Sequence, residues 1–325
     1  MTENHQQYIF HIGLPKTASS TLQKKLFPFV PNVNNFSLYP TNNVAGSNEI
    51  AEGLNSLYLK DNRVFAFYKA LHNQPEVSPD SLKDMWEVLL NAHSEHSVSL
   101  LSHEALTSAF FSSIPVYEKL YRIKAVFPNA KIIIVIRDQL SWLHSQYTDH
   151  PFDPINLTRG SPYTFEEWVV KFLLHPQLVK ARAALNYYDL ICECQRLFGA
   201  NRLTVIRYEW LQDAPYRFYE AWANLLGVTR DFVESRLSNQ VENRGLSQIY
   251  NRLRQRQRWQ QLAGFNSSLT NRLLLNNALK LMPKAQYTLS PQTKQSVLDF
   301  YTDSNNALQK LWDGKICENS LLSGK

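Results

Sequence analysis

Four short runs of apolar and β-branched residues constrain the fold of this chain more than any other feature of its sequence. Each run is followed by a polar turn and then by a stretch with helical periodicity. Apolar runs of ~4–8 residues that alternate with helices indicate a parallel sheet whose two faces are both covered. The runs are residues 8–12, 98–101, 132–136 and 203–207, and residues 36–39 form a further strand candidate.

The sequence therefore predicts an α/β fold, with a doubly wound, mainly parallel sheet flanked by helices. The helices expected around the sheet cover residues 20–27, 81–93, 116–127, 140–147 and 216–226.

The chain changes character after about residue 231, where the periodicity becomes helical and no run is typical of a strand. No internal repeat or low-complexity linker interrupts the sequence. We therefore expect one domain over residues 1–325, with an α/β core at 1–230 and a helical C-terminal extension at 231–325. The helices expected in the extension lie near residues 246–262, 273–281 and 297–311.

The charge of the chain favours anionic ligands. The 34 Lys and Arg residues exceed the 28 Asp and Glu residues, which gives a net charge of +6. Nucleotide phosphates, an acidic glycan, nucleic acid and a membrane surface all fit this charge, and charge alone does not choose between them. No nucleic-acid-binding motif is recognisable, so we expect no nucleic-acid partner.

The cysteines and the hydropathy pattern indicate a soluble, cytoplasmic protein. Cys192, Cys194 and Cys317 give an odd count without metal-ligand spacing, which predicts buried or incidental thiols. The N-terminus has no basic and apolar leader, so we expect no signal peptide. The longest apolar run, residues 132–136, is far shorter than the ~20 residues of a membrane-spanning helix. Peripheral membrane contact stays open.

The most informative segment follows the first predicted strand. The strand leads into Gly13, a turn through Pro15 and then Lys16, and four hydroxyl side chains come before an amphipathic helix. The hydroxyl residues are Thr17, Ser19, Ser20 and Thr21. Unpaired N–H groups at the helix start, a lysine and hydroxyl donors together attract an anion. We call residues 13–21 the anion loop.

Two other interpretations of the anion loop fit the sequence less well. A plain helix cap needs one hydroxyl rather than four, and it needs no lysine. A nucleotide-kinase loop has two glycines before its Lys-Ser/Thr, whereas Lys16 follows Gly13 by three positions and Pro15 stands in place of a glycine. The shorter loop suits a nucleotide with one phosphate at its reactive end.

Residues 11–23, with the sequence HIGLPKTASSTLQ, resemble the 5′-phosphosulfate-binding loop of sulfotransferases that use 3′-phosphoadenosine 5′-phosphosulfate (PAPS). The segment is most similar to the bacterial branch, whose loop commonly reads Pro-Lys-Thr-Gly-Thr-Thr. The resemblance implies a P-loop-like fold. Ala18 replaces the usual glycine, which requires a negative φ or modest strain at this position. The residues that would bind the 5′-phosphosulfate are Pro15, Lys16, Thr17, Ala18, Ser19, Ser20 and Thr21.

A second element begins where the strand at residues 132–136 ends. Arg137 follows that strand, where open α/β sheets bind ligands, and Ser145 comes eight positions later on a predicted helix. Taken alone, Arg137 could simply pair with Asp138 or Glu104. The spacing of Arg137, Ser145 and a tyrosine two positions further resembles the 3′-phosphate element of the same family.

Two weaker similarities lie further along the chain. Arg244 and Gly245 resemble the late basic-Gly segment with which many sulfotransferases contact the 3′-phosphate. The strand at residues 203–207 ends in Arg-Tyr-Glu, as a late strand of the family does. We expect Glu209 in that motif to cap or pair rather than to catalyse.

The resemblance implies sulfuryl transfer without a metal ion. Lys16 would stabilise the charge that develops on the leaving oxygen. The acceptor hydroxyl needs a base, and Glu104 and His103 both follow the strand at residues 98–101. Either of them, or neither if they only cap and pack, fits the sequence, and Glu104 matches the bacterial relatives better. His11 is expected to be a packed, hydrogen-bonded strand histidine.

The sequence thus predicts a sulfotransferase that uses PAPS, releases 3′-phosphoadenosine 5′-phosphate and requires no metal. By family analogy the acceptor would be a hydroxyl of a carbohydrate or glycolipid, less favourably an amine, and it could be anionic. Four arginines at residues 252–258 would form either a solvated helix face or a rim that attracts such an acceptor. A kinase on a related fold and a non-catalytic nucleotide-binding protein are the alternatives. The sequence does not predict the oligomeric state.

Overall fold

The computed structural model describes residues 6–38, 56–107, 114–149, 154–155, 163–238 and 287–313. The chain divides into two compact units. The first comprises Met1–Asp138, Val179–Gln240 and Phe300–Lys325, and the second comprises Gln139–Leu178 and Val241–Asp299.

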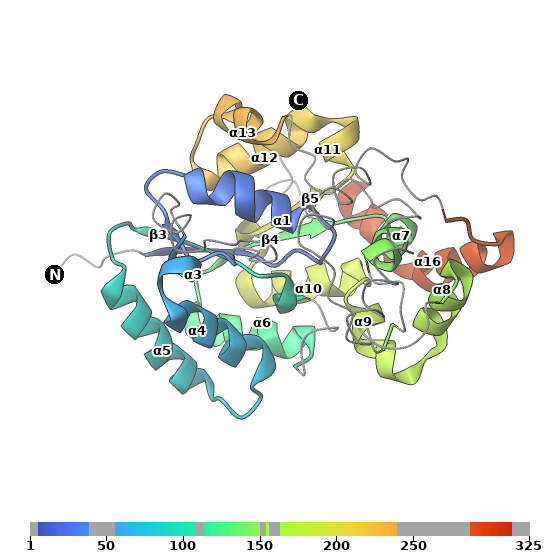
Figure 1. Ribbon diagram of the computed structural model, residues 1–325, viewed down its shortest axis with the longest axis horizontal. Coiled ribbons are helices and arrows are strands. Elements are labelled where there is room, and N and C mark those ends of the chain that lie inside the picture. The colour runs from blue at the N-terminus through green and yellow to red at the C-terminus, as the bar shows by residue number, and fades with distance from the viewer. Residues whose placement is uncertain are drawn as a thin grey trace, which may run out of the picture. The chain divides into compact units, whose positions relative to one another are not determined.

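The first unit is built on a five-stranded sheet in the order β2-β3-β1-β4-β5, in which all neighbouring strands are parallel (Figure 1). The strands are β1 (Gln7–His11), β2 (Asn34–Asn35), β3 (Val98–Ser102), β4 (Lys131–Ile136) and β5 (Leu203–Arg207). The chain leaves β1 toward one edge of the sheet and leaves β4 toward the other. The topological switch point, where such sheets bind ligands, therefore lies between β1 and β4.

Four of the five predicted strands are confirmed, and the strand predicted at residues 36–39 is wrong. The strand there is β2, at Asn34 and Asn35, and two further backbone hydrogen bonds, from Phe36 and Leu38 to β3, continue its direction. Hydropathy does not mark this strand because it consists of polar residues. Their amides are satisfied inside the protein, since Asn34 Nδ2 donates to the His96 carbonyl at 2.7 Å and Asn35 Oδ1 accepts from the Ser37 N–H at 3.0 Å.

Helices cover both faces of the sheet (Figure 1). Successive side chains of a strand point to opposite faces, so each strand packs against both layers of helices. On one face, Ile9 and Ile133 pack with residues of η1, the π-helical continuation of α1, and with residues of α12 and α13. On the other face, Phe10 and Trp86 both contact the ring of Phe127, with centroid distances of 4.8 and 4.9 Å. Because both faces of the sheet are buried, the sequences of the strands are continuous apolar runs.

The helices and turns of the first unit, in chain order, are α1 (Ser19–Thr21), η1 (Leu22–Leu26), η2 (Phe27–Phe29), α3 (Leu57–Lys60), α4 (Asn62–Asn73), α5 (Pro79–Ala92), η3 (Glu104–Leu106), α6 (Val116–Val126), α9 (Val179–Ala183), α10 (Tyr187–Phe198), η5 (Ala200–Arg202), α11 (Trp210–Asp213), α12 (Pro215–Leu226) and α13 (Arg230–Leu237). The helices predicted around the sheet in this unit are confirmed, apart from their ends. The first of them changes from α-helix to π-helix and then to a 3₁₀ turn.

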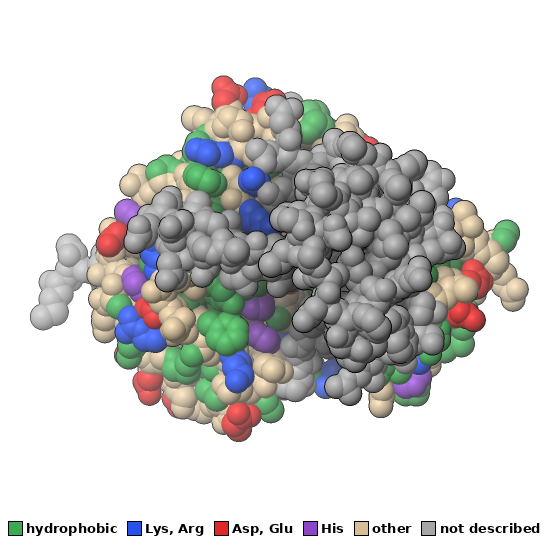
Figure 2. Space-filling model, in the orientation of Figure 1, with side chains coloured by type: hydrophobic (Ala, Val, Ile, Leu, Met, Phe, Trp, Pro, Cys, Tyr) green, Lys and Arg blue, Asp and Glu red, His purple; other side chains and the backbone are tan. Residues whose placement is uncertain are grey.

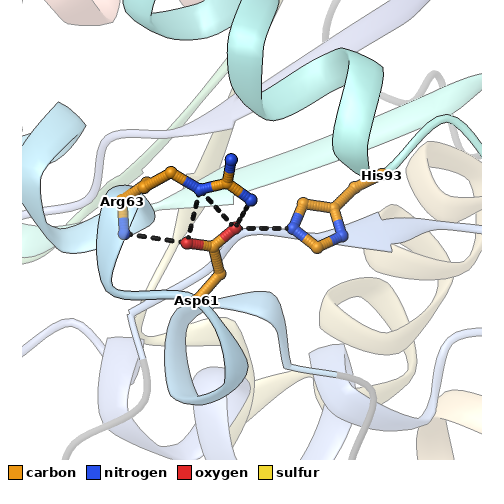
Figure 3. Close-up of polar contacts among 3 residues, drawn as sticks. All are labelled: Asp61, Arg63 and His93. Carbon is orange, nitrogen blue, oxygen red and sulfur yellow. Dashed lines mark hydrogen bonds and ion pairs between the residues drawn. The ribbon is translucent and has the colours of Figure 1, made fainter.

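The helix α4, which the sequence analysis did not predict, begins at a capping carboxylate (Figure 3). Asp61 accepts from the Arg63 backbone N–H at 2.9 Å and from the Arg63 guanidinium Nη2 at 2.6 Å. The same carboxylate bonds to Nε2 of His93, just after α5, at 2.8 Å. These hydrogen bonds, above all those from Arg63, hold the pKa of Asp61 well below its usual range. One side chain thus caps α4 and ties it to α5.

Two buried cations on α6 hold neighbouring backbone. The Arg122 guanidinium donates to the carbonyls of Ala70, Gln74 and Pro75, at 3.1, 3.1 and 2.8 Å, at the end of α4. The Lys119 ammonium is fully buried and donates to the Ala105 carbonyl in η3 at 2.6 Å. Burial lowers the pKa of Lys119 to about 7.

The second unit contains α7 (Gln139–Asp149), α8 (Phe165–Leu174), η4 (Pro176–Leu178) and the start of α16 (Pro291–Asp313). The Phe172 ring stacks on Trp168 at 5.5 Å and contacts Trp142 at 6.0 Å. Glu166 accepts from the Ser290 N–H and hydroxyl, at 2.9 and 2.7 Å, where α16 begins. The helices predicted at residues 140–147 and 297–311 are confirmed within α7 and α16.

Helices predicted near residues 246–262 and 273–281 lie outside the described residues. Within the described ranges, no helix combines the length and apolar character that a membrane span requires. Cys194 is buried on α10, as predicted, and Cys192 is half-buried; within the described residues neither forms a disulfide.

Candidate active site

The anion loop leaves the carboxyl end of β1, beside the switch point of the sheet. Lys16 and Ala18 adopt left-handed conformations, with φ of 68° and 67°, whereas Thr17 between them does not. Backbone that alternates in this way turns successive N–H groups toward one concave side, which is an arrangement that binds anions. Of the two possibilities left open for Ala18, the structure shows the strained one, since a side chain at positive φ costs energy that glycine avoids.

The hydroxyl side chains of the anion loop separate into two pairs. Thr17 and Ser19 are buried, and their hydroxyls donate to the Leu14 carbonyl at 2.5 and 3.4 Å. A hydroxyl has one proton, so these two side chains close the loop on itself. Ser20 and Thr21 are half-buried and form no side-chain hydrogen bond within the described part of the chain, which leaves their protons available for a ligand.

His11 lies under the loop as a neutral, buried group. Its Nδ1 lies 2.7 Å from Ser102 Oγ, and burial lowers the pKa of its imidazole to about 3. This confirms His11 as a hydrogen-bonded strand histidine. The ring lies so close to Gly13 that a Cβ added there would be 2.6 Å from His11 Nε2. Gly13 is therefore required by the approach of the histidine ring.

Arg137 stands at the end of β4, across the switch point from the anion loop. Its Nη1 donates to the Lys16 carbonyl at 2.6 Å, and its guanidinium lies 4.3 Å from the ring centroid of Tyr208. The Tyr187 hydroxyl, on α10, donates to the Arg137 carbonyl at 2.7 Å and accepts from the Arg137 N–H at 3.4 Å. Burial lowers the pKa of Arg137, but a guanidinium remains charged.

Tyr187 and Tyr208, which contact Arg137, were not predicted as site residues from the sequence. Tyr208 belongs to the Arg-Tyr-Glu motif, so the motif could have suggested it. Tyr187 has no local signal, because only the packing of α10 brings its hydroxyl to the end of β4. The next residue of the motif, Glu209, accepts from the Asp138 N–H at 2.8 Å, which confirms its pairing role.

The turn η3 carries the two candidate bases. His103 Nδ1 accepts the Ala105 N–H at 3.0 Å. Burial, together with the positive charges of His72 and Lys119, lowers the pKa of His103 to about 3. A neutral imidazole with an accepting Nδ1 carries its proton on Nε2, so His103 has no lone pair to offer a substrate. Glu104, half-buried at the first position of η3, is the remaining candidate.

The η3 turn and the anion loop are joined directly. The Thr107 hydroxyl, at the end of η3, donates to the Gly13 carbonyl at 3.0 Å. At the other end of the turn, the amide of Gln23 donates to Ser102 Oγ at 2.9 Å.

On the face drawn in Figure 2, Lys and Arg side chains lie over the α1 region, and His side chains lie among hydrophobic ones nearer α4.

The first unit therefore brings together the anion loop, Arg137 and the turn with Glu104. Ser145 lies on α7, in the second unit, so its expected pairing with Arg137 stays a prediction. Arg244, Gly245 and the arginines at residues 252–258 lie outside the described residues. Among the residues that are described, no group of three His, Cys, Asp or Glu side chains could hold a metal ion.

Comparisons with known proteins agree with this arrangement. The model of the sulfotransferase family matches residues 8–232, which include the anion loop, η3, β4 and Arg137. Among solved structures, the chain is similar to the crystal structure of a sulfotransferase from Alicyclobacillus acidocaldarius, with a TM-score of 0.51 and 14% sequence identity. The match covers 94% of this chain and 95% of that chain, and at this identity it is a likeness of fold. A search of curated proteins gives no match. Since the family match spans well over half of its 325 residues, the chain belongs to the sulfotransferase family.

Proposed function

We propose that this protein transfers a sulfuryl group from PAPS to a hydroxyl of an acceptor, most favourably a carbohydrate or glycolipid. One observation carries the choice of donor. Two anion-binding elements, the loop after β1 and Arg137 after β4, meet at the switch point, where Arg137 Nη1 lies 2.6 Å from the Lys16 carbonyl. A nucleotide with phosphate at both its 3′ and 5′ positions needs two such elements, whereas a kinase has no use for the second.

The roles of the residues follow from the chemistry of sulfuryl transfer, in which negative charge develops on the leaving bridging oxygen. The N–H groups of the anion loop, with Ser20 and Thr21, would hold the 5′-phosphosulfate. Lys16 would stabilise the developing charge. A guanidinium has five N–H donors, so one arginine can bond both to the Lys16 carbonyl and to a phosphate, and Arg137 would bind the 3′-phosphate in this way.

Glu104 would accept the proton of the acceptor hydroxyl. Its competitor His103 already uses Nδ1 to accept the Ala105 N–H, which supports the choice of the carboxylate. In this proposal Ser145, Arg244 and Gly245 complete the 3′-phosphate site, and the reaction needs no metal. We also propose that the protein acts as a single domain in the cytoplasm.

Calorimetric titration with 3′-phosphoadenosine 5′-phosphate, without magnesium, tests the donor. ADP and Mg·ATP serve as comparisons. We expect the 3′-phosphorylated nucleotide to bind at least ~10-fold more tightly than ADP, a difference of ~1.4 kcal/mol. Arg137→Ala should abolish this preference and Lys16→Ala should weaken binding. Arg207→Ala, an exposed arginine at the end of β5, is the matched control.

Tighter binding of Mg·ATP would contradict PAPS as the donor. Should Mg·ATP bind best and Arg137→Ala change nothing, the protein is a phosphotransferase rather than a PAPS-dependent enzyme. The acceptor is then sought by offering neutral glycans, acidic glycans, glycolipids and amines with radiolabelled PAPS. Labelling of amines alone would contradict the proposed hydroxyl acceptor.

A further inference from the structure

The turn that carries Glu104 is held at both of its ends, by the helix η1 that follows the anion loop at one end and by the anion loop itself at the other. Before the turn, Gln23 Nε2 donates to Ser102 Oγ at 2.9 Å and to the Ser102 carbonyl at 3.3 Å. After the turn, Thr107 Oγ1 donates to the Gly13 carbonyl at 3.0 Å. Gln23, Ser102 and Thr107 are all buried, with exposed fractions of 1%, 0% and 0%. Solvent therefore does not compete for these hydrogen bonds.

Gln23 is a polar side chain in an apolar environment, which is energetically unfavourable unless its amide is hydrogen-bonded. It lies in η1 between Leu22 and Leu26, both of which are fully buried in the hydrophobic cluster on one face of the sheet. A buried amide costs free energy unless it is hydrogen-bonded, so a leucine would fill this position at lower cost if packing were the only requirement. Two acceptors of one residue, Ser102, take the amide protons, which fixes the orientation of the side chain. The two hydrogen bonds of Gln23 therefore fix the position of Ser102 relative to η1.

His11 adds a third connection to the same point. Its backbone pairs in register with Ser102 across β1 and β3, and its Nδ1 lies 2.7 Å from Ser102 Oγ. The ring of His11 in turn lies against Gly13, the first residue of the anion loop. Ser102 thus forms hydrogen bonds both to β1, which precedes the anion loop, and to η1, which follows it.

We propose that Gln23 and Thr107 are positioning residues that hold the anion loop and the Glu104 turn in one fixed register. This inference rests on the proposed function, in which the loop holds the 5′-phosphosulfate and Glu104 takes the proton of the acceptor. Neither residue touches substrate. Gln23 sets the helix end of the loop and Thr107 sets its strand end, so loss of either one displaces the N–H groups that would bind the 5′-phosphate.

The test compares two nucleotides that differ only in the 5′-phosphate. The ratio of affinities for 3′-phosphoadenosine 5′-phosphate and adenosine 3′-monophosphate isolates the contribution of the anion loop. It is measured in wild type, Gln23→Leu, Thr107→Val and the double variant, below the unfolding temperature of each. Gln212→Leu on α11 and Thr204→Val on β5, whose side chains are at least partly exposed, are the matched controls.

Each single substitution should lower the ratio about fivefold, the effect of one buried hydrogen bond. The double variant should be little worse than the more severe single one, because the two ends act as one unit. The controls should leave the ratio unchanged. If Gln23→Leu does not fold, the affinity ratio of Thr107→Val, which replaces the hydroxyl with a methyl group of similar size, tests the proposal.

Two other outcomes overturn the inference in distinguishable ways. A lower unfolding temperature with an unchanged ratio means that Gln23 and Thr107 only stabilise the core, and it leaves the proposed function standing. A wild-type protein that does not distinguish the two nucleotides removes the proposed function, and the inference with it.

Discussion

Arg137 and Lys16 are joined by a hydrogen bond of 2.6 Å from the guanidinium to the main-chain carbonyl, although 121 positions separate them in the sequence. The direction of that carbonyl depends on the left-handed conformation of Lys16, with φ of 68°. The shape of the anion loop therefore sets the position of the arginine. Substitutions in either element should disturb binding at both.

Tyr187→Phe should weaken recognition of the 3′-phosphate. The variant removes the hydroxyl that contacts both the carbonyl and the N–H of Arg137, so the arginine backbone loses a buried partner. We expect the preference for 3′-phosphoadenosine 5′-phosphate over adenosine 5′-monophosphate to fall about 3- to 10-fold. Tyr216→Phe, at an exposed tyrosine, should leave this preference intact. Equal preferences in Tyr187→Phe and wild type would show that the hydroxyl has no positioning role.

Ala18→Gly should stabilise the protein. Glycine adopts a φ of 67° without the steric cost that alanine incurs, which outweighs its greater freedom in the unfolded chain. We expect the free energy of unfolding in urea to rise by about 0.5–1 kcal/mol. The same change at Ala66, exposed in the middle of α4, should instead lower it by about 1 kcal/mol. Destabilisation at both positions would contradict the left-handed conformation of Ala18.

His103→Asn and Glu104→Gln should separate the two candidate bases. Asparagine can replace His103 Nδ1 as the acceptor of the Ala105 N–H, so we expect transfer activity to stay within about tenfold of wild type. Glu104→Gln keeps the shape and removes the base, and it should lower kcat by about 10²–10⁴-fold. Nucleotide affinity, measured alongside, should be unchanged in both variants. The reverse order of the two losses would assign the proton transfer to the histidine.

The stability of the protein should fall as the pH drops below about 6.5, partly because of His11. The folded-state pKa of His11 is lowered to about 3, so the unfolded chain binds the proton first. The contribution is fully present above the unfolded pKa and is lost between pH 6.5 and 3, by about 2 kcal/mol at pH 5. His11→Asn should show a correspondingly smaller decrease from pH 7 to pH 5 in denaturant unfolding. Parallel decreases in the variant and wild type would refute the assignment.

Asp61 should produce a second loss of stability at lower pH. Its pKa is lowered in the folded state, so its contribution is present above the unfolded value of about 3.9 and disappears as the pH falls below it. Asp61→Ala removes the cap of α4 and should cost about 1 kcal/mol at pH 7. Asp61→Asn keeps a capping oxygen but has no charge to titrate, so it should flatten the unfolding profile at acid pH. A profile for Asp61→Asn as steep as that of wild type would contradict the ion pair drawn in Figure 3.

The sequence predicted those parts of the fold that depend on local pattern. Buried parallel strands form continuous apolar runs, and for this reason β1, β3, β4 and β5 were found. The short strand β2 was misplaced because Asn34 and Asn35 are buried by hydrogen bonds that no hydropathy pattern records. The helix α4 was not predicted, although its buried residues Val64, Phe67 and Leu71 recur at helical spacing.

The candidate site was predictable in its motifs and not in its contacts. Lys16, Arg137 and Glu104 stood out because each follows a strand of a parallel sheet. The choice between Glu104 and His103 needed the hydrogen bond to Ala105, which depends on the geometry of a single turn. The left-handed φ of Ala18 was equally hidden, because the sequence allowed either sign.

The strand order has a consequence for how this protein folds. β1 is made first, but it lies in the middle of the sheet, and its partners are β3 at Val98–Ser102 and β4 from Lys131 onward. Contacts between residues so distant in the chain close slowly, because a long loop must be ordered before any pairing stabilises it. During synthesis, the segment that forms the anion loop must therefore wait until β4 has left the ribosome. Until β3 and β4 have both been made, the apolar residues of β1 lack one or both of their neighbouring strands, which makes the early nascent chain the state most in need of a chaperone.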